Sequence, residues 1–448
     1  MGVAMIIHVV EQGETLDSIA SRYGISVERL IPENGIRTTD SLVVGETLVI
    51  MVPEIIYTIQ DGDTLESIAL AHNISIFELL RNNPYLSERK YIYPGEDIVI
   101  KYEGEKTGTL ITNGYAYPFI DMNILRKTLP FLTYLSIYSY YYNINGEILD
   151  LNDEELIRTA KEYGVAPVMI LNALAENPLE EIEMLRYLLE NTFMQDLLIS
   201  NIITLLYRKG YYGVNFSAHY IHPEYRPLYV EFIRKLSTRL RSEGFRTFIT
   251  LAFNVFELLL NVNYDDLQYE LLEKYVDQIT MITYDWGLSY ISPSVLAYNT
   301  IDNFIKLITS RISPQDLNFG ISTIGYVWRL PYIEGVSTGQ SITFDAAIEL
   351  AREHGAQIKY DEESKASYFQ YYLDFEYIVR FRDARGIESI LVFMEQNGLN
   401  SLGIWNIMYF FDQMWMVINS QYFIEKILPV SGKNSVNSFN NVTLKIDK

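Results

Sequence analysis

Cysteine is absent from this sequence of 448 residues. Its absence excludes disulfides, thiolate metal sites and cysteine nucleophiles, so we expect packing alone to hold the fold together. The sequence also lacks an apolar run of about 18 residues, which a membrane-spanning helix needs. The first residues, Met1 to His8, have neither the basic segment nor the apolar run of a secretory signal. We therefore predict a protein that is made in the cytoplasm without a signal peptide and without membrane insertion.

Basic residues are scarce, with 35 Lys and Arg against 57 Asp and Glu and a formal net charge of -22. A surface that binds nucleic acid or an anionic membrane neutralises phosphates with lysine and arginine, so this composition argues against both partners. Tyrosine, by contrast, is abundant, with 36 residues. Tyrosine rings fill cores, cover sugar faces and are enriched at interfaces, so the excess fits barrel packing, carbohydrate contact or assembly.

An internal repeat occupies the first hundred residues. The segment Gly13–Ala20, GETLDSIA, recurs 49 residues later as GDTLESIA at Gly62–Ala69. A match of this length indicates a duplicated structural unit. Further matches pair Asn34 with Asn83 and, with a slip of one residue, Gly45-Glu46 with Gly95-Glu96.

Each repeat predicts a βααβ unit, and we place the two units at residues 6–52 and 55–101. A first strand is followed by a glycine turn and by a helix that Thr15 or Thr64 caps. A second helix and a closing strand complete the unit. The expected first and closing strands are His8–Glu11 and Thr47–Ile50 in one unit, and Tyr57–Gln60 and Asp97–Ile100 in the other.

The second repeat reads YTIQDGDTLESIA from Tyr57, followed by NNP at Asn82–Pro84 and IYPGE at Ile92–Glu96. This pattern resembles the LysM module, which binds N-acetylglucosamine polymers such as peptidoglycan or chitin between the loop after its first strand and the loop before its second. The first repeat departs at Val43-Val44, which implies a weaker sugar site. A turn and a helix cap alone would also explain the glycines and threonines. The resemblance implies groove residues Gly62, Asp63, Thr64, Asn83, Pro84, Tyr93 and Pro94 in the second repeat, and Gly13, Glu14, Thr15 and Asn34 in the first.

From about Gly108 onward, strand-like runs alternate with helical stretches such as Asp153–Tyr163, Glu180–Lys209 and Pro227–Ser242. Eight such strands predict an α/β fold, a (β/α)8 TIM barrel over residues 108–429, with its active site at the C-terminal strand ends. The polar residues 430–448 predict a flexible tail. The predicted strands are Leu110–Tyr115, Tyr134–Tyr138, Pro167–Leu171, Gly213–Phe216, Arg246–Leu251, Gln278–Tyr284, Leu317–Ser322 and Ser401–Trp405.

The fourth predicted strand lacks the chemistry of a sugar-cleaving barrel. Alternate strand residues point the same way, and an acid is needed there to protonate the glycosidic oxygen. The segment from Gly213 to Tyr220, GVNFSAHY, offers Ser217 and His219 instead.

Several strand ends nevertheless resemble a family-18 glycoside hydrolase of the spore-cortex-lytic type, in which LysM repeats precede an N-acetylglucosaminidase barrel. In that family the fourth strand carries Asp-x-x-Asp-x-Asp-x-Glu, often with Asn at the second acidic site. The Glu is the general acid, and the Asp before it orients the N-acetyl group of the substrate. These positions fall on Tyr212, Asn215, Ser217 and His219, of which only Asn215 fits. The segments that carry the resemblance are Asn113-Gly114-Tyr115, Gly164–Pro167, Gly210–Asn215, Thr283–Gly287, Gly320-Ile321-Ser322, Gly355–Glu362, Phe381–Arg385 and Gly403-Ile404-Trp405.

The resemblance therefore implies that the catalytic motif is not intact. Ser217 carries no charge, and His219, with an ordinary pKa of about 6.5, is mostly neutral at pH 7. Loss of a general acid alone costs a factor of about 10²–10⁴ in rate. His219 and Glu224 are the candidates for a displaced acid, with Glu176 and Asp285 as further acids nearby; hydrogen-bonded filler is the alternative role for His219.

Other strand-end residues imply sugar contact without cleavage. Trp405 matches the ring on which the sugar stacks in the family, with ordinary core burial as the alternative, and Trp286 and Trp328 are candidates for the groove rim. His219 and His222 have only Glu224 nearby, so we expect neither a metal nor a cofactor. The predicted sugar contacts in the barrel are Tyr115, Asn215, Tyr284, Asp285 and Trp405.

Three hypotheses of function follow. The first is a catalytically inactive hydrolase-like protein that binds N-acetylglucosamine-containing glycan in the cortex, coat or outer layer of a bacterial spore. The second is an N-acetylglucosaminidase that acts on spore cortex with a displaced acid. The third is a self-assembling coat protein whose sugar sites are vestigial.

Overall fold

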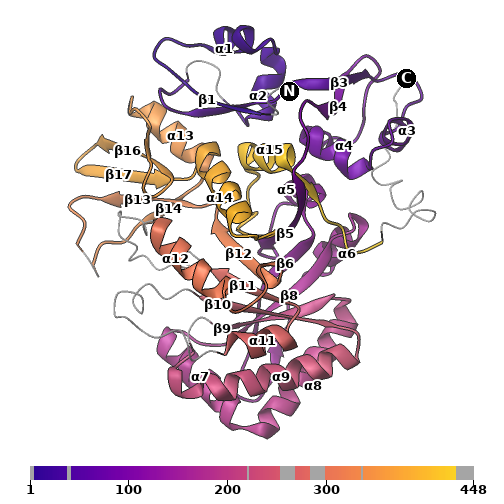
Figure 1. The fold of residues 1–448 in the computed structure, drawn as a ribbon, viewed down its shortest axis with the longest axis vertical. Helices are drawn as coiled ribbons and strands as arrows, with labels where there is room; N and C mark the ends of the chain where they lie inside the picture. The colour runs from indigo at the N-terminus through magenta and orange to yellow at the C-terminus, as the bar shows by residue number, and fades with distance from the viewer. Residues whose placement is uncertain are drawn as a thin grey trace.

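The computed structural model describes residues 5–37, 42–218, 221–252, 268–282, 298–333 and 336–429. Figure 1 shows two small N-terminal units lying against a larger α/β domain. This arrangement confirms the predicted order of two repeats and a barrel. The predicted tail, residues 430–448, lies outside the described residues.

Both repeats have the predicted βααβ order, and in each the two strands pair antiparallel. The side chains of Thr15 and Thr64 accept hydrogen bonds from the backbone of Ser18 and Ser67, whose side chains bond back, and this capping box sets where each first helix begins. Both first strands begin earlier than predicted, because their pairing extends to the ends of the closing strands. The first repeat comprises β1 (Ile6–Val9), α1 (Leu16–Tyr23), α2 (Val27–Glu33) and β2 (Thr47–Ile50), and the second β3 (Pro53–Thr58), α3 (Leu65–Ala71), α4 (Ile76–Asn82), η1 (Pro84–Glu88) and β4 (Asp97–Tyr102).

Eight parallel strands close the barrel. Neighbouring strands follow the order β5-β18-β12-β11-β10-β9-β8-β6, and a pairing between β5 and β6 completes the ring. Each strand overlaps its predicted range, so the (β/α)8 fold is confirmed. The strands are β5 (Gly108–Ala116), β6 (Tyr134–Tyr142), β8 (Ala166–Ala173), β9 (Gly213–Ala218), β10 (Arg246–Ala252), β11 (Gln278–Ile282), β12 (Leu317–Ser322) and β18 (Ser401–Trp405).

Helices cover the outside of the barrel (Figure 1). The stretch Glu180–Lys209 forms two helices, because Asn191 ends the first and its side chain accepts a hydrogen bond from Met194 N at the start of the second. The helices are α5 (Met122–Thr128), α6 (Glu154–Glu162), α7 (Pro178–Glu190), α8 (Thr192–Lys209), α9 (Arg226–Ser242), α11 (Tyr269–Tyr275), α12 (Tyr298–Thr309), α14 (Ala384–Gln396) and α15 (Asp412–Gln421). Short elements are η2 (Leu129–Phe131), β7 (Ile148–Leu149), η3 (Pro223–Tyr225), η5 (Pro314–Asp316) and β19 (Tyr422–Ile424).

A second sheet, which the sequence reasoning did not predict, is inserted between β12 and β18. Five strands pair antiparallel in the order β14-β13-β17-β16-β15, and we call residues 325–381 the inserted sheet. Figure 1 shows it beside the barrel, below the first repeat. It comprises β13 (Gly325–Arg329), β14 (Gln340–Ile342), α13 (Phe344–Glu353), β15 (Lys359–Asp361), β16 (Ala366–Tyr372) and β17 (Glu376–Phe381).

Both repeats are fixed to the barrel through α15. Thr47 Oγ1 in the first repeat donates to Gln413 Oε1 at 2.8 Å, and Gln413 Nε2 donates to the Thr47 carbonyl at 2.5 Å. In the second repeat, Asn82 Oδ1 accepts from Asn419 Nδ2 at 2.9 Å. All four side chains are buried. Because buried hydrogen bonds of this kind are costly to break, the repeats and the barrel form one packed body.

A buried carboxyl group, Glu46, lies beside the contact between the first repeat and the inserted sheet. Its side chain is 5% exposed, and its Oε2 has no hydrogen-bond partner. Burial raises the pKa of Glu46 to about 7, while a hydrogen bond from the Val43 backbone and the charge of Arg352 oppose the shift. The folded protein therefore favours the protonated form of Glu46.

We predict that Glu46→Gln stabilises the protein at pH 8 and has little effect at pH 4.5. Because the folded-state pKa is raised, the wild-type carboxyl group loses stability as the pH rises from about 4.5 to about 7, and the loss is then constant. The gain at pH 8 should be about 1–3 kcal/mol in the free energy of unfolding. Urea denaturation at both pH values measures it, with the exposed Glu11→Gln as the control. An equal change at both pH values would contradict the assignment.

Candidate carbohydrate-binding site

The eight barrel strands contain no aspartate or glutamate within their bounds. Their one charged residue is Arg246, at the start of β10, which is the end away from the active-site face of such barrels. The strands therefore present only neutral polar, apolar and aromatic side chains at their C-terminal ends.

A network of amides and hydroxyls fills part of the barrel interior. A buried amide or hydroxyl is stable when it is hydrogen-bonded, whereas a buried carboxylate would need a cation or several donors. The bonds run from Ser136 Oγ to Asn113 Oδ1 (2.8 Å), Thr250 Oγ1 to Asn215 Oδ1 (3.0 Å), Asn318 Nδ2 to Thr280 Oγ1 (3.1 Å), Ser401 Oγ to Asn318 Oδ1 (2.9 Å) and Gln278 Nε2 to Ser401 Oγ (2.9 Å).

The motif positions on β9 lie at different heights in the barrel. Asn215 is fully buried and Ser217 is 5% exposed, two residues nearer the C-terminal end on the same side of the strand. Tyr212 precedes β9 at its N-terminal end, with its ring 6.1 Å from that of Tyr134. At about 3.3 Å per residue, Tyr212 lies about 16 Å from Ser217 and outside the mouth of the barrel. His219 lies outside the described residues.

Two buried amide groups at this end of the barrel have unused hydrogen-bonding atoms. Asn172 on β8 donates through Nδ2 to Ser139 Oγ at 2.7 Å, and its Oδ1 has no partner. Asn215 on the neighbouring strand accepts from Thr250, and its Nδ2 has no partner. Unpaired buried polar atoms are costly, so a ligand that satisfies them gains affinity. The register pairs Ile170 with Asn215, so Asn172 lies two residues nearer the C-terminal ends of the strands than Asn215 does.

Aromatic rings form one side of the barrel mouth. Half-buried Trp405, at the end of β18, lies with its ring 5.0 Å from that of Tyr138 and 5.7 Å from that of Tyr117. Tyr117 stacks at 5.2 Å on Phe119, whose side chain is 77% exposed. We call Tyr117, Phe119, Tyr138 and Trp405 the aromatic wall. Sequence reasoning identified only Trp405, although Tyr117 and Phe119 directly follow β5 and Tyr138 lies in the predicted second strand.

Tyr115 lies within the barrel next to this wall. Its side chain is 1% exposed, its ring is 6.1 Å from that of Trp405, and its hydroxyl donates to Thr280 Oγ1 at 3.4 Å. Burial raises the pKa of Tyr115 to about 12, so the hydroxyl keeps its proton. The structure therefore places Tyr115 behind Trp405, as a support for it.

The acids considered as replacement proton donors lie in different surroundings. Glu176, which follows β8, and Glu224, in η3, are both solvent-exposed. The Glu224 backbone N–H donates to His222 Nδ1 at 3.4 Å, and His222 is exposed as well. The described residues therefore leave both carboxyl groups open to solvent, whereas a general acid must be held against the glycosidic oxygen. Tyr284, Asp285 and Trp286 lie outside the described residues.

Trp328 does not line the rim, contrary to expectation. Its side chain is 2% exposed in β13, and its ring lies 5.5 Å from that of Tyr326. Alternation along the strand places Trp328 with Tyr326 on the face opposite Val327, which packs against the main core. The Trp328 ring is covered instead by the segment at Gly339. This burial could not be anticipated without knowing that the sheet exists.

Asn34 and Asn83, which the internal repeat pairs, are buried and bond to the backbone of their own units. Asn34 is 4% exposed and Asn83 1% exposed. Asn34 Nδ2 donates to the Leu30 and Val49 carbonyls, and its Oδ1 accepts from Val49 N. Asn83 makes the same three bonds to Leu79 and Val99. Each amide thus ties the second helix to the closing strand with three hydrogen bonds, and both side chains are buried, so the structure gives these two residues a structural role.

The turn after each first strand is built around an acidic side chain. Glu14 accepts from Glu11 N and from His8 Nε2, both at 2.8 Å, and the first of these bonds is the main cause that lowers the pKa of Glu14. Asp63 accepts from Gln60 N at 2.7 Å and from the Tyr57 hydroxyl at 2.8 Å. The neighbouring residues Gly13, Gly62 and Pro94 are exposed, Thr15 is exposed as the helix cap, Thr64 and Pro84 are half-buried, and Tyr93 is 47% exposed.

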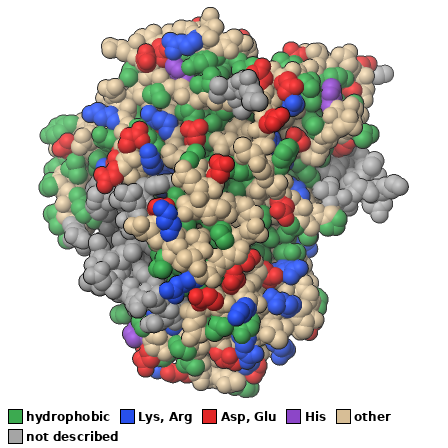
Figure 2. Space-filling model, in the orientation of Figure 1, with side chains coloured by type: hydrophobic (Ala, Val, Ile, Leu, Met, Phe, Trp, Pro, Cys, Tyr) green, Lys and Arg blue, Asp and Glu red, His purple; other side chains and the backbone are tan. Residues whose placement is uncertain are grey.

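The described surface offers no other obvious ligand chemistry. Among the residues that the structure describes, no group of three or more His, Asp or Glu could hold a metal ion. None of the helices described is long and apolar enough to cross a membrane. Figure 2 shows acidic and basic side chains interspersed on one face, without a continuous basic patch.

Comparison with known proteins assigns both parts of the chain. The profile of Glycosyl hydrolases family 18 matches residues 185–409, and the LysM domain profile matches residues 8–50 and 57–101. The chain belongs to glycosyl hydrolase family 18. We therefore call its repeats LysM1 and LysM2.

Relatives within this family share the whole arrangement. The chain is 30% identical over 435 residues to the cortical fragment-lytic enzyme of Bacillus subtilis (strain 168), covering 94% of this chain and 99% of the relative. It is 29% identical over 427 residues to the protein of the same name from Bacillus anthracis, with 93% and 98% covered. The crystal structure of the Bacillus cereus spore cortex-lytic enzyme SleL matches with a TM-score of 0.76 and 25% identity, covering 95% of this chain and all of SleL.

We predict that Trp405→Ala weakens binding of N-acetylglucosamine oligomers to the barrel about tenfold or more. Removing the indole takes away the apolar face on which a sugar ring would lie, a loss of about 1.4 kcal/mol or more. The measurement is calorimetric titration with chitin oligomers. It uses a Tyr93→Ala background, which weakens binding by LysM2, so that the heat measured comes mainly from binding to the barrel. The matched control is Phe375→Ala, which removes a 40% exposed ring from the inserted sheet. If the two substitutions reduced the affinity for the oligomer equally, Trp405 would not be part of the binding site.

Proposed function

We propose that this protein binds N-acetylglucosamine-containing glycan, such as peptidoglycan or a chitin-like polymer, and does not hydrolyse it. One observation carries the proposal: the eight barrel strands provide no carboxyl group, and the sequence has His219 where the family motif has its acid. Cleavage needs a proton donor at the glycosidic oxygen and negative charge near the developing positive charge. Neither Asn215 nor Ser217 supplies them.

The barrel mouth keeps features that suit binding. Trp405 and the rest of the aromatic wall offer an apolar surface for a pyranose ring. The free Oδ1 of Asn172 and the free Nδ2 of Asn215 suit an acetamido group. Small-molecule sites commonly combine such an apolar wall with a few placed polar atoms. Asp285 and Tyr284 remain further candidates for sugar contact on the family resemblance.

We infer a place in the bacterial spore, in the cortex, coat or outer layer. The support is the description of the relatives as cortical fragment-lytic and spore cortex-lytic enzymes. The two LysM repeats support attachment to the same glycan.

The relatives' names also favour a second candidate, an N-acetylglucosaminidase that acts on cortex with a displaced acid. Glu224 and His219 are the donors that this alternative requires. The exposure of Glu224 weighs against it, because a general acid must be held at the scissile bond.

The exposed end of the inserted sheet favours a third, structural role in self-assembly. Large apolar side chains gather in the two loops at this end: Ile333 is 55% exposed, Val336 69%, Tyr372 74% and Leu373 62%. Such groups often mark protein contacts. Concentration-dependent assembly in light scattering, together with no retention on peptidoglycan or chitin, would favour this role over glycan binding.

We predict that the wild-type protein is retained on peptidoglycan but releases no sugar from cortex fragments, as chromatography of the products would show. Ser217→Asp combined with His219→Glu restores the general acid and the orienting acid, and should give sugar release at least about 10² above the detection limit set by the wild type. The matched control is Ser217→Asn combined with His219→Gln, which keeps the shapes without the charges. Wild-type turnover that Glu224→Gln or His219→Ala abolishes would establish the second candidate instead.

A further inference from the structure

The two LysM repeats differ in what surrounds the loop before the closing strand. In each repeat, the ligand loops are the loop after the first strand (residues 10–15 and 59–64) and the loop before the closing strand (residues 42–46 and 92–96). The sequence repeat pairs Gly45 with Gly95, and therefore Val43-Val44 with Tyr93-Pro94. This pairing allows the surroundings of the loops to be compared position by position.

In LysM1 the loop before the closing strand is packed against the inserted sheet. The Ile358 backbone N–H donates to the Val44 carbonyl at 2.9 Å, and Arg385 Nη2 donates to the Gly45 carbonyl at 3.3 Å. A side chain at Gly45 would collide with the Ile358 carbonyl. Val43 is 5% exposed. The backbone carbonyls that this loop could offer to a ligand are therefore already used within the chain.

In LysM2 the equivalent loop is open. A side chain at Gly95 would meet no atom within 4 Å, in contrast to Gly45, whereas the opposite loops are open at Gly13 and at Gly62 alike. Tyr93 is 47% exposed and Pro94 is exposed. Tyr93 therefore presents an aromatic ring beside an unobstructed loop, as a sugar-binding groove requires.

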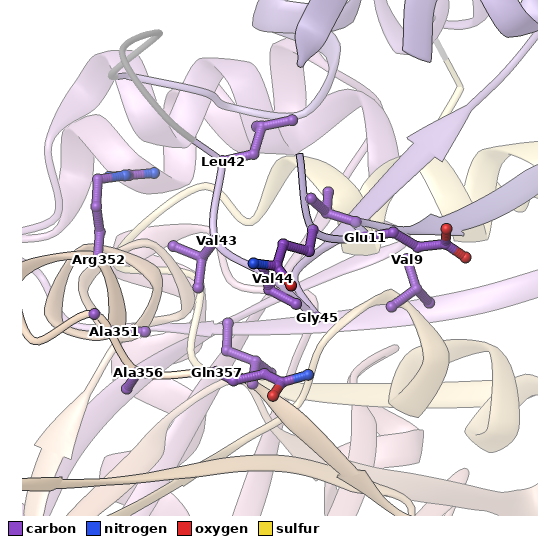
Figure 3. Close-up of a pocket in the computed structure, with 14 residues that line it drawn as sticks. Val9, Glu11, Leu42, Val43, Val44, Gly45, Ala351, Arg352, Ala356 and Gln357 are labelled. Carbon is purple, nitrogen blue, oxygen red and sulfur yellow. The ribbon is translucent and has the colours of Figure 1, made fainter. Parts of the chain in front are cut away.

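A crevice of about 730 Å³ remains between the LysM1 loops and the end of α13. Figure 3 shows Val43, Val44 and Gly45 on one side of it and Ala351, Ala356 and Gln357 on the other. Its volume would hold a sugar, but no aromatic residue lines it, and most of its wall is aliphatic. A pyranose face would find no ring to stack on there, so the crevice is better explained as the margin of a packing contact.

We propose that the loop before the closing strand of LysM1 serves as a docking surface for the inserted sheet, and that LysM2 alone of the two repeats captures the glycan strand. LysM1 thereby fixes LysM2 at a set position relative to the barrel. The proposal rests on the proposed function only for the identity of the ligand.

Single cysteines introduced at equivalent positions test the proposal, because the chain has no cysteine of its own. In the Pro94→Cys variant we expect rapid labelling by a maleimide, slowed at least about fivefold by saturating chitin oligomer. In the Val44→Cys variant, whose thiol would lie half-buried at the margin of the crevice, we expect a labelling rate that the oligomer does not change. Circular dichroism spectra that match the wild type confirm that both variants are folded.

Protection of the Val44→Cys thiol by the oligomer would overturn the proposal, because it would place glycan in the LysM1 loops. If the oligomer protected neither thiol, the proposal would be overturned as well, because LysM2 would then not be the capture site. Retention of the wild-type protein on chitin beads distinguishes these results from a failure of the proposed function. If the beads retain the protein and neither thiol is protected, binding belongs to the barrel alone.

Discussion

The barrel closes around side chains that form hydrogen bonds without carrying charge. Asn113, Asn215, Thr280 and Asn318 each make a side-chain hydrogen bond in the interior. A carboxylate there would lose its hydration, and the one cation of the described barrel strands, Arg246, lies at their N-terminal end. This network pairs most of its buried polar atoms without burying a charge, and leaves Asn215 Nδ2 and Gln278 Oε1 without a partner. The same property leaves no carboxyl group on the described barrel strands to donate the proton that glycoside cleavage requires. The stability of this interior and its proposed lack of hydrolysis therefore have one physical origin.

Binding depends less on charge than catalysis does. A sugar ring gains affinity from an apolar surface and from a few hydrogen bonds, and the aromatic wall with Asn172 and Asn215 can provide both without ionising. Trp405 is held between Tyr138 and Tyr115, so its ring is already in position before a ligand arrives. A pre-arranged ring loses little conformational freedom on binding. The proposed absence of the acid is therefore compatible with glycan binding by this part of the site.

The sequence predicted what depends on local pattern and missed what depends on tertiary contact. All eight barrel strands were predictable because each is a short apolar run between helical stretches. The inserted sheet was not, because its strands lie close together without that alternation, and with it the burial of Trp328 was missed. Asn34 and Asn83 were assigned to a groove because their spacing matches the LysM pattern, whereas the structure shows that the match reflects three backbone bonds made by each amide. The aromatic wall was missed except for Trp405, because closure of the barrel brings the ends of β5, β6 and β18 together.

Duplication produced two copies of one loop, and packing has separated their roles. A loop that docks on the chain's own backbone gains from small aliphatic residues, because these fill a narrow contact without leaving a hydroxyl unpaired. Val43-Val44 in LysM1 meets this requirement against Ile358, and Tyr93-Pro94 in LysM2 does not. A tyrosine at position 43 would have to bury its hydroxyl at a site that is 5% exposed. The difference between the repeats at these two positions therefore follows from where each repeat packs on the rest of the chain. It is also the reason why we propose LysM2 as the repeat that binds glycan.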